Sequence, residues 1–352
     1  MTYFTPIVDR NIKFALVGCG RIAKNHFDAL KQHADRAELV GVCDVVPEPV
    51  EAAARETGAR PYDSLSEMLA KTDADIVVLT TPSGLHPQQT VEVARSGRHV
   101  LTEKPMATRW NDGLRMVRAC DEAGVRLFVV KQNRRNLTLK MLKNAILKGR
   151  FGRIYMVNIN VFWTRPQEYY DAAPWRGKWE FDGGAMMNQA SHYIDLLDWL
   201  VGPIESVHAY TATLGRRIET EDTGVVSIRW RSGALGSMNV TMLTYPKNFE
   251  GSITILGEKG TVRVGGLAVN EIQHWEFSDI DPDDSKIKSA NYETTSVYGF
   301  GHPLYYDNVI KVLRGEAAPE TDGREGLRSL EVLIATYLSA RDGKRVALPL
   351  EY

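Results

Sequence analysis

The chain has 352 residues, of which 43% are hydrophobic and 25% are charged, so it has the composition of a globular protein with a full core. This length predicts two domains. The formal net charge of −1 excludes a general attraction to nucleic acid or anionic membranes. No stretch approaches the ~20 apolar residues that cross a bilayer, and the first residues lack the layout of a signal peptide.

The three cysteines, Cys19, Cys43 and Cys120, are widely spaced and form no CxxC pair. This spacing argues against a disulfide framework and against a zinc site, so we expect no metal. We expect reduced thiols in a cytoplasmic protein.

The first 135 residues alternate strand-like and helix-like segments. The predicted strands are 13–17, 38–44, 76–80, 100–103 and 127–131, and the predicted helices are 23–32, 47–57, 87–96 and 110–123. Strands that alternate with helices of about ten residues indicate crossover units on a parallel sheet. We therefore predict an α/β, doubly wound Rossmann domain over residues 1–135.

The pattern changes after a linking helix at 139–148. The predicted strands are 154–163, 204–213, 224–230, 235–243, 251–256 and 267–277, and the predicted helices are 185–200, 303–313 and 323–340. Short connections between successive strands favour an antiparallel meander with one solvated face. We predict an α+β domain over residues 136–352, with an open sheet, helices, and a mobile polar loop at 279–288.

A glycine turn separates the first predicted strand from the first predicted helix. Its sequence, Gly18-Cys19-Gly20-Arg21-Ile22-Ala23, fits the dinucleotide pattern G-x-G-x-x-G/A. In that pattern the first glycine permits the tight turn and the second lets the backbone approach a pyrophosphate at the helix N-terminus. Asp44 ends the next strand, where a carboxylate accepts hydrogen bonds from a ribose and repels a 2′-phosphate. These features predict NAD rather than NADP.

Polar residues follow the later strands of this domain. Strand ends border the ligand crevice of a doubly wound sheet, so we expect Thr80, Thr81 and Pro82 to lie over the cofactor. His86 either touches the nicotinamide ribose or caps the next helix. The following strand ends in Glu103-Lys104-Pro105.

Taken together, the motifs ALVGCGRIA, TTPSGLHPQQT and EKPMA, with a later helix that carries His192, resemble the glucose–fructose oxidoreductase/inositol dehydrogenase/MocA (Gfo/Idh/MocA) family. The resemblance covers nearly the whole chain. It implies oxidation or reduction of a sugar or polyol carbon, and a lysine at position 104 near the reacting hydroxyl. It also implies a cis peptide bond before Pro105.

The second-domain stretch GGAMMNQASHYIDLLDWL departs from the family pattern. Many members have an aspartate where this chain has Asn188, four residues before His192, and both positions lie on one helix face. Asn188 orients a hydroxyl but cannot take its proton. Because histidine titrates near neutral pH and lysine does not, we favour His192 as the base, with Lys104 stabilising the alkoxide. The reverse assignment stays open, and we expect Asp195 to have a structural role.

The stretches NQASHYIDLLDWL and KQNRRN resemble the WlbA/WbpB subgroup, which oxidises the C3 hydroxyl of UDP-N-acetylglucosaminuronate. In that subgroup the 3-keto product feeds an aminotransferase in lipopolysaccharide O-antigen synthesis, and some members recycle NADH with 2-oxoglutarate. Such a substrate needs cations, and the chain offers a group of them at Lys131, Arg134, Arg135, Lys140 and Arg165.

These considerations assign the site residues. The expected catalytic residues are Lys104, His192 and Asn188. The expected cofactor contacts are Gly18, Gly20, Arg21, Ile22, Asp44, Thr80, Thr81, Pro82, His86, Glu103, Lys104, Gln132, Trp163 and Arg165. The expected substrate contacts are Lys104, Lys131, Asn133, Arg134, Arg165, Tyr169, Asn188 and His192.

Two other functions stay open at this point. One is a dehydrogenase of the same family that acts on a free sugar or a polyol such as inositol. The other is a non-enzymatic regulator that binds NAD. We expect a homo-oligomer, a dimer or tetramer, by resemblance alone.

Overall fold

The protein is described by a computed structural model that covers residues 4–294 and 301–350. The chain forms two compact units, described separately below. Unit 1 comprises residues up to Lys131 together with His302–Leu330, and unit 2 comprises Gln132–Gly301 with Glu331 onward. Across the described ranges, no helix is long and apolar enough to cross a membrane.

Unit 1 is built on a parallel sheet, which confirms the predicted Rossmann fold. Its six described strands are ordered β3-β2-β1-β4-β5-β6. The strands are β1 (Ile12–Val17), β2 (Ala37–Cys43), β3 (Arg60–Tyr62), β4 (Ile76–Leu79), β5 (His99–Thr102) and β6 (Leu127–Val129). The order reverses between β1 and β4, and a doubly wound sheet binds its ligand at such a point.

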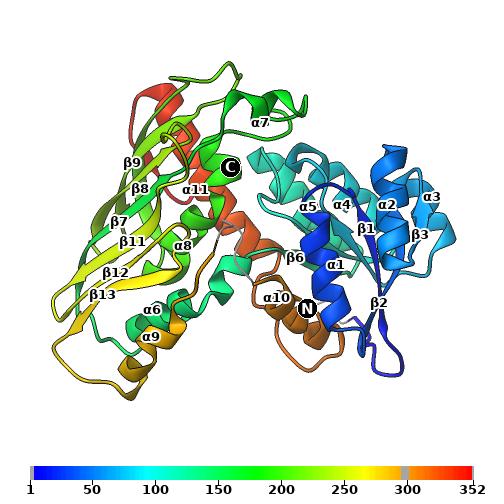
Figure 1. The fold of residues 1–352 in the computed structure, drawn as a ribbon, viewed down its shortest axis with the longest axis horizontal. Coiled ribbons are helices and arrows are strands. Elements are labelled where there is room, and N and C mark those ends of the chain that lie inside the picture. Colours follow the sequence, from blue (N-terminus) through cyan, green and yellow to red (C-terminus); the bar gives the residue numbers. More distant parts are fainter. Residues whose placement is uncertain (1–3, 295–300, 351–352) are drawn as a thin grey trace. The chain divides into compact units, whose positions relative to one another are not determined.

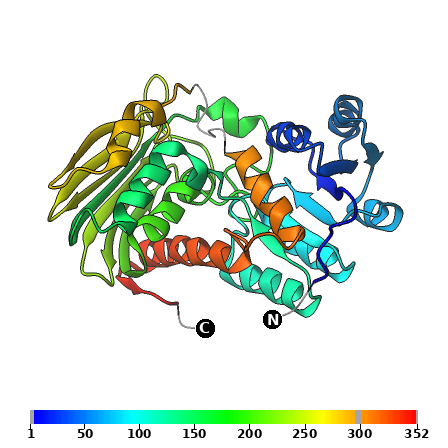
Figure 2. The ribbon, with the colours of Figure 1, turned by 90° about the horizontal axis from the view of Figure 1, so that it is seen from below.

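Helices cover both faces of this sheet (Figure 2). They are α1 (Ala23–Gln32), α2 (Pro47–Thr57), α3 (Leu65–Lys71), α4 (His86–Arg95), α5 (Trp110–Glu122), α10 (His302–Leu313) and the start of α11 (Gly323–Asp342). Helices α1 and α2 have the predicted bounds. The short elements β3 and α3 were not predicted, because segments of three and seven residues carry too little periodicity.

The C-terminal part of the chain returns to unit 1, which differs from the expected single second domain over 136–352. Tyr305, Tyr306 and Ile310 of α10 are buried in one core with Phe14 of β1 and Phe27 of α1. The apolar face of α10 is therefore part of the core of unit 1, although α10 follows most of unit 2 in the sequence. Figure 1 shows α10 beside α1.

Unit 2 is built on a mixed, mostly antiparallel sheet, as predicted in outline. Its eight described strands are ordered β13-β12-β11-β7-β10-β9-β8-β14. They are β7 (Ile154–Phe162), β8 (Ile204–Ala212), β9 (Thr223–Trp230), β10 (Leu235–Thr241), β11 (Glu250–Gly257), β12 (Gly260–Gly265), β13 (Glu271–Phe277) and β14 (Val346–Ala347). The expected simple meander is wrong at one point, since β7 lies between β10 and β11 and pairs in parallel with β10.

Helices α6 (Leu137–Leu147) and α8 (Ser191–Val201) lie against one face of this sheet (Figure 2). Burial alternates along β9, which fits a sheet with one covered face. The predicted helix 185–200 is divided into a π-helix (Ala185–Gln189) and α8. Another short helix, α7 (Gln167–Asp171), precedes them.

The polar segment 279–288 is ordered by charge, against the expected mobile loop. It contains a 3-10 helix (Pro282–Lys286), followed by α9 (Ile287–Ala290). Asp281 caps the 3-10 helix and pairs with Lys148, and Asp284 pairs with Arg150 at 2.7 Å. Residues far apart in the sequence therefore supply the order that the local composition lacks.

Candidate functional site

The glycine turn after β1 has the form of a phosphate cradle. Gly18 has φ 96°, and a Cβ there would lie 2.8 Å from the backbone carbon of Thr80. The Thr80 hydroxyl donates to the Gly18 carbonyl at 2.6 Å, which fixes the turn against β4. A Cβ at Gly20 would meet no atom within 4 Å, so the backbone there is open to a ligand. These residues fit a dinucleotide whose diphosphate faces the N-terminus of α1.

Asp44 lies where the predicted ribose-binding acid belongs. Its Oδ2 accepts from the Cys19 amide at 2.7 Å, and its Oδ1 accepts from the Val46 amide at 2.9 Å. The carboxylate is thus tied to the glycine turn itself and is partly exposed. This arrangement fits the two hydroxyls of an unphosphorylated ribose.

His86 joins two loops at the carboxyl edge of the sheet. It is fully buried, and its ring nitrogens lie 2.9 Å from the Thr81 carbonyl and 3.2 Å from the Pro105 carbonyl. Burial lowers the pKa of His86 below its ordinary value. Both contacts are to carbonyls, so the ring does not cap α4 and instead links the β4–α4 loop to the Lys104–Pro105 turn. The expected contact of His86 with the nicotinamide ribose stays a prediction. The bond before Pro105 is cis, as expected.

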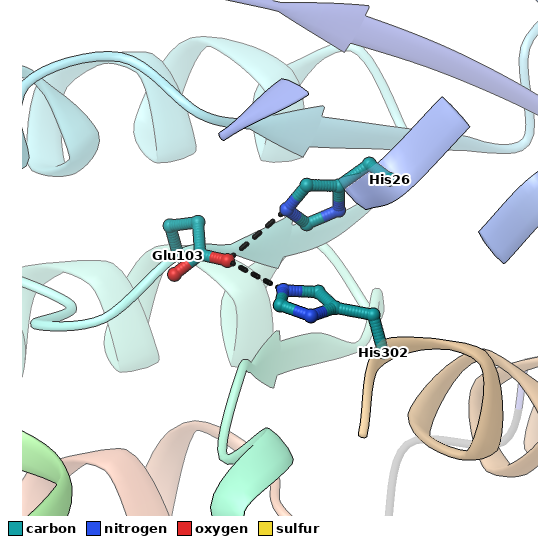
Figure 3. A group of neighbouring side chains, drawn as sticks. All are labelled: His26, Glu103 and His302. Carbon is teal, nitrogen blue, oxygen red and sulfur yellow. Dashed lines mark hydrogen bonds and ion pairs between the residues drawn. The ribbon is translucent and has the colours of Figure 1, made fainter. Parts of the chain in front are cut away.

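Glu103 is buried inside unit 1 beside two histidines (Figure 3). Its Oε1 lies 3.1 Å from Nε2 of His26 and 3.2 Å from Nε2 of His302, while its Oε2 accepts from the Lys104 amide at 3.0 Å. Burial opposes the charged form, but the hydrogen bonds from both histidines outweigh it, so the pKa of Glu103 lies well below its ordinary value. These three contacts use both carboxylate oxygens, and the expected contact of Glu103 with the cofactor stays a prediction.

In unit 2, a buried glutamate holds the start of the π-helix. The Met186 amide donates to Oε1 of Glu221 at 2.9 Å, and the hydroxyl of Tyr337 donates to the same oxygen at 2.8 Å. The Met187 amide in turn donates to that hydroxyl at 3.0 Å. A Cβ at Gly184 would lie 1.7 Å from Glu221, so the glycine makes room for the carboxyl. Burial raises the pKa of Glu221 to about 7.

Asn188 and His192, the candidate catalytic pair, each have a polar partner in unit 2. The Asn188 amide donates to Oδ1 of Asp182, which is buried and whose Oδ2 accepts from the Gly177 amide at 2.7 Å. Because a carboxylate only accepts, the NH₂ end of Asn188 must face it and the carbonyl end points elsewhere. Asn188, which replaces the aspartate of many family members, is therefore hydrogen-bonded to a carboxylate six residues earlier, that of Asp182.

Gln132 binds the ring of His192. The distance between Nε2 of Gln132 and Nε2 of His192 is 3.0 Å, and Gln132 is 1% exposed. A glutamine NH₂ group only donates, so this ring nitrogen accepts and the neutral ring carries its proton on Nδ1. The amide turned by half a rotation would instead accept from a protonated ring. Gln132, expected to contact the cofactor, is thus a partner for both protonation states of His192.

Part of the expected cation group is already used within the protein. The Arg134 guanidinium makes two bonds of 2.7 Å to the carboxylate of Asp195, which confirms the structural role expected for Asp195. Lys131 is buried and donates to the Ser329 hydroxyl. Asn133 is also buried. An anionic substrate would share these groups with their protein partners.

A second group of cations surrounds Tyr169, and these side chains are partly exposed. Arg165 and Arg176 lie over the Tyr169 ring at 5.6 Å and 4.2 Å from its centre, and Gln189 of the π-helix donates to its hydroxyl at 3.2 Å. Trp163 is more enclosed than these side chains, and its expected contact with the cofactor stays a prediction. It is 2% exposed and its indole donates to the Leu267 carbonyl at 3.0 Å.

Comparison with known proteins agrees with this architecture. Residues 12–131 match the domain described as "Oxidoreductase family, NAD-binding Rossmann fold", and residues 143–348 match the "C-terminal alpha/beta domain" of the same family. The chain belongs to the Gfo/Idh/MocA oxidoreductase family.

Two solved structures of Gfo/Idh/MocA proteins are similar over nearly the whole chain. A WlbA dehydrogenase from Chromobacterium violaceum, in complex with NADH and UDP-GlcNAcA, is 73% identical and covers 100% of both chains with a TM-score of 0.96. A WlbA dehydrogenase from Bordetella pertussis, in complex with the same two ligands, is 74% identical and covers 98% of this chain and 100% of its own, with a TM-score of 0.96. The D-apiose dehydrogenase of Paraburkholderia graminis is 25% identical over 98% of this chain and 92% of its own length.

Family membership confirms the predicted fold class, the oxidoreductase class and NAD as the cofactor. The roles of individual residues stay predictions. Sequence reasoning missed five side chains that the structure brings to the candidate residues: His26, His302, Arg176, Asp182 and Glu221. Asp182 lies six residues before Asn188 and His26 lies three residues after the glycine motif, but no sequence pattern marks any of the five.

The two glycines of the turn should respond differently to alanine. Gly18→Ala should lower the free energy of unfolding by about 1–3 kcal/mol, because φ is positive and the Cβ meets Thr80. Gly20→Ala should leave stability unchanged and weaken NADH binding about tenfold or more, since the new methyl occupies open space. Denaturant melts and NADH fluorescence titrations measure both. Undiminished NADH affinity in Gly20→Ala would contradict the cradle.

Glu221 should make stability depend on pH. The pKa of Glu221 in the folded protein is about 7, above the ordinary value of 4.5. Its contribution to the free energy of unfolding is therefore fully present below about pH 4.5 and is lost as the pH rises through 7. Glu221→Gln should therefore be more stable than wild type at about pH 8.5, by up to about 3 kcal/mol, and no different at about pH 4.5. Urea melts at both values measure this.

The control for this experiment is Glu219→Gln, two residues away, where the carboxylate is 45% exposed in an ion pair with Lys178. It should show no such divergence with pH. If the difference in stability between Glu221→Gln and wild type is the same at both pH values, folding does not raise the pKa of the Glu221 carboxyl.

Proposed function

We propose that this protein is an NAD-dependent dehydrogenase that oxidises the C3 hydroxyl of UDP-N-acetyl-2-amino-2-deoxyglucuronate to the 3-keto sugar. The observation that carries this proposal is 73–74% identity, over at least 98% of the chain, to WlbA dehydrogenases in complex with NADH and UDP-GlcNAcA. The other family relatives with named substrates are about 25% identical, too distant to favour their own substrates.

The chemistry of the described residues supports an anionic sugar nucleotide. The guanidinium groups of Arg165 and Arg176 lie 5.6 Å and 4.2 Å from the centre of the Tyr169 ring, and such groups bind carboxylate and phosphate through paired bonds. The aromatic ring offers a surface for a planar base or a sugar face. A neutral polyol such as inositol has no anionic group that could pair with these guanidinium groups.

The reaction needs a group that takes a proton and a group that stabilises the alkoxide. We propose that His192 takes the proton of the C3 hydroxyl while Lys104 holds the oxygen, with the reverse assignment as the alternative. Gln132 supports this role of His192, because its amide can pair with the neutral or the protonated ring. Asn188, anchored through its NH₂ end to Asp182, presents its carbonyl to a substrate hydroxyl. Bound NAD⁺ supplies the acceptor for the hydride that leaves C3.

The setting of the reaction follows from the same resemblance. We propose that the product serves an aminotransferase in lipopolysaccharide O-antigen synthesis and that 2-oxoglutarate regenerates NAD. A cytoplasmic location agrees with three buried or partly buried thiols whose pKa burial raises to about 12, which keeps them unreactive.

A homo-oligomer is also proposed, and the exposed face of the unit 2 sheet supports it. Tyr210 and Val225 face each other across β8 and β9 and are 72% and 45% exposed. Met156 and Leu235 are paired on β7 and β10 and are about equally exposed. Such apolar pairs on an open sheet are typical of an interface between copies.

A substrate panel tests the proposed function. UDP-N-acetylglucosaminuronate, other UDP-sugars, glucose and inositol are each incubated with NAD, with and without 2-oxoglutarate, and products are identified by mass spectrometry. We expect turnover only with the UDP-uronate, and thermal protection by UDP alone. Oxidation of inositol without protection by UDP would favour the polyol alternative. Failure to turn over any member, with NADH still bound, would favour a regulator.

Single substitutions test the two catalytic candidates. Lys104→Ala and His192→Ala should each lower kcat by about 10²–10⁴, because each removes an acid–base or alkoxide-stabilising group. NADH titration should confirm that both variants still bind the cofactor. Lys31→Ala, an exposed lysine in the last turn of α1, is the control and should retain full activity. If both catalytic variants keep full turnover, the assignment is wrong.

A further inference from the structure

We propose that Glu103 is a positioning residue for Lys104, and that His26, His302 and Tyr306 hold it in place. This inference rests on the proposed function, since it gives Lys104 its role in the reaction. It assigns a purpose to a buried polar cluster that neither the glycine turn nor the cation groups explain.

The first step is the position of the carboxylate. Glu103 follows β5 directly, and its side chain turns back so that Oε2 accepts from the amide of Lys104. On the other side, the Glu103 amide donates to the Leu79 carbonyl of β4 at 3.0 Å. The peptide group that precedes Glu103 is thus bonded to β4, and the peptide group between Glu103 and Lys104 is bonded to the Glu103 carboxylate and, through its carbonyl, to the Thr102 hydroxyl at 3.2 Å. Lys104 begins from a backbone that cannot rotate freely.

The second step is what keeps this carboxylate charged and fixed. A buried carboxylate costs free energy unless donors surround it, and Oε1 receives one from His26 and one from His302. The two histidines come from α1 and α10, at opposite ends of unit 1 in sequence, and Figure 3 shows both rings directed at the same oxygen. Glu103 is 5% exposed and both rings are no more exposed than that.

The third step is the proton order in the cluster. Nδ1 of His26 lies 2.7 Å from the Tyr306 hydroxyl. Since Nε2 of His26 must carry a proton to donate to Glu103, Nδ1 of the neutral ring accepts from Tyr306. Burial raises the pKa of Tyr306 well above its ordinary value, and the charge of Glu103 adds to this, so the hydroxyl keeps its proton. The Tyr306 hydroxyl thus donates to His26, and His26 and His302 each donate to Glu103.

The same three side chains, Glu103, His26 and His302, have ligand atoms close enough together to hold a metal ion. Two observations favour hydrogen bonds. Both N···O distances are ordinary hydrogen-bond lengths, and the carboxylate's other oxygen is bonded to the Lys104 amide rather than to a fourth ligand. Metal content is nevertheless one outcome of the test.

A double-mutant cycle tests the proposal. Glu103→Gln, Lys104→Ala and the double variant are compared by single-turnover NADH formation with the UDP-uronate. Glu103→Gln keeps the shape, but its one carbonyl oxygen cannot accept from the two histidines and from the Lys104 amide at the same time, so the rate should fall about 10–100-fold through misplacement of Lys104. KM for the UDP-uronate should change little. In the Lys104→Ala background the same change should have no further effect, because its target is gone.

His302 provides a second arm that does not alter Glu103. His302→Gln keeps an N–H donor near the position of Nε2 and should retain most of the rate, while His302→Leu removes it and should match Glu103→Gln. Glu122→Gln, an exposed carboxylate on α5, is the control and should be unaffected.

Three results would overturn the proposal. An equal loss from Glu103→Gln in both backgrounds would mean a general structural role. Equal rates for His302→Gln and His302→Leu would mean that the donor is irrelevant. A metal ion bound in equal amount to the protein, and lost in Glu103→Gln, would mean a metal site. By contrast, a full rate in Lys104→Ala alone would refute the proposed role of Lys104, which separates that failure from these.

Discussion

The close approach of Gly18 to the backbone of Thr80 is the contact on which the nucleotide-binding unit depends. Because Gly18 has no side chain, the turn after β1 can lie against the end of β4, where the strand order of the sheet reverses. Parallel strands bring their carboxyl ends to one edge, so Asp44, Thr81 and Glu103 follow β2, β4 and β5 at that same edge. The topology of the sheet therefore brings these polar residues to one edge, whatever their side chains.

Two buried glutamates show how surroundings decide the state of one residue type. Glu103 faces two histidines and a backbone amide, and its pKa is depressed in spite of burial. Glu221 faces one amide and one hydroxyl, both on the same oxygen, and burial prevails to raise its pKa. Donor number and charge, rather than burial alone, make the first a fixed anion and the second a group that titrates near neutrality.

Sequence patterns predicted the regular parts of this fold well, and they failed where long-range contacts decide. Helices α1 and α2 have strong caps or periodicity and were predicted to the residue, whereas the break at the π-helix depends on Glu221 and Tyr337, which are remote in the chain. The motifs located Lys104, Asn188 and His192. They carried no signal for His302, which is 199 residues from its partner Glu103. A contact between residues so far apart in the sequence produces no local pattern from which it could be predicted.

The return of α10 to the Rossmann core has a consequence for the growing polypeptide. The sheet strands and α1 emerge from the ribosome early, but Tyr305, Tyr306 and Ile310, which share their core, are made only after nearly all of unit 2. Unit 1 therefore cannot complete its core while the chain is still being synthesised, because the residues of α10 that pack into this core are made late. Until α10 has been synthesised, the nucleotide-binding unit exposes an apolar surface that is buried in the folded protein.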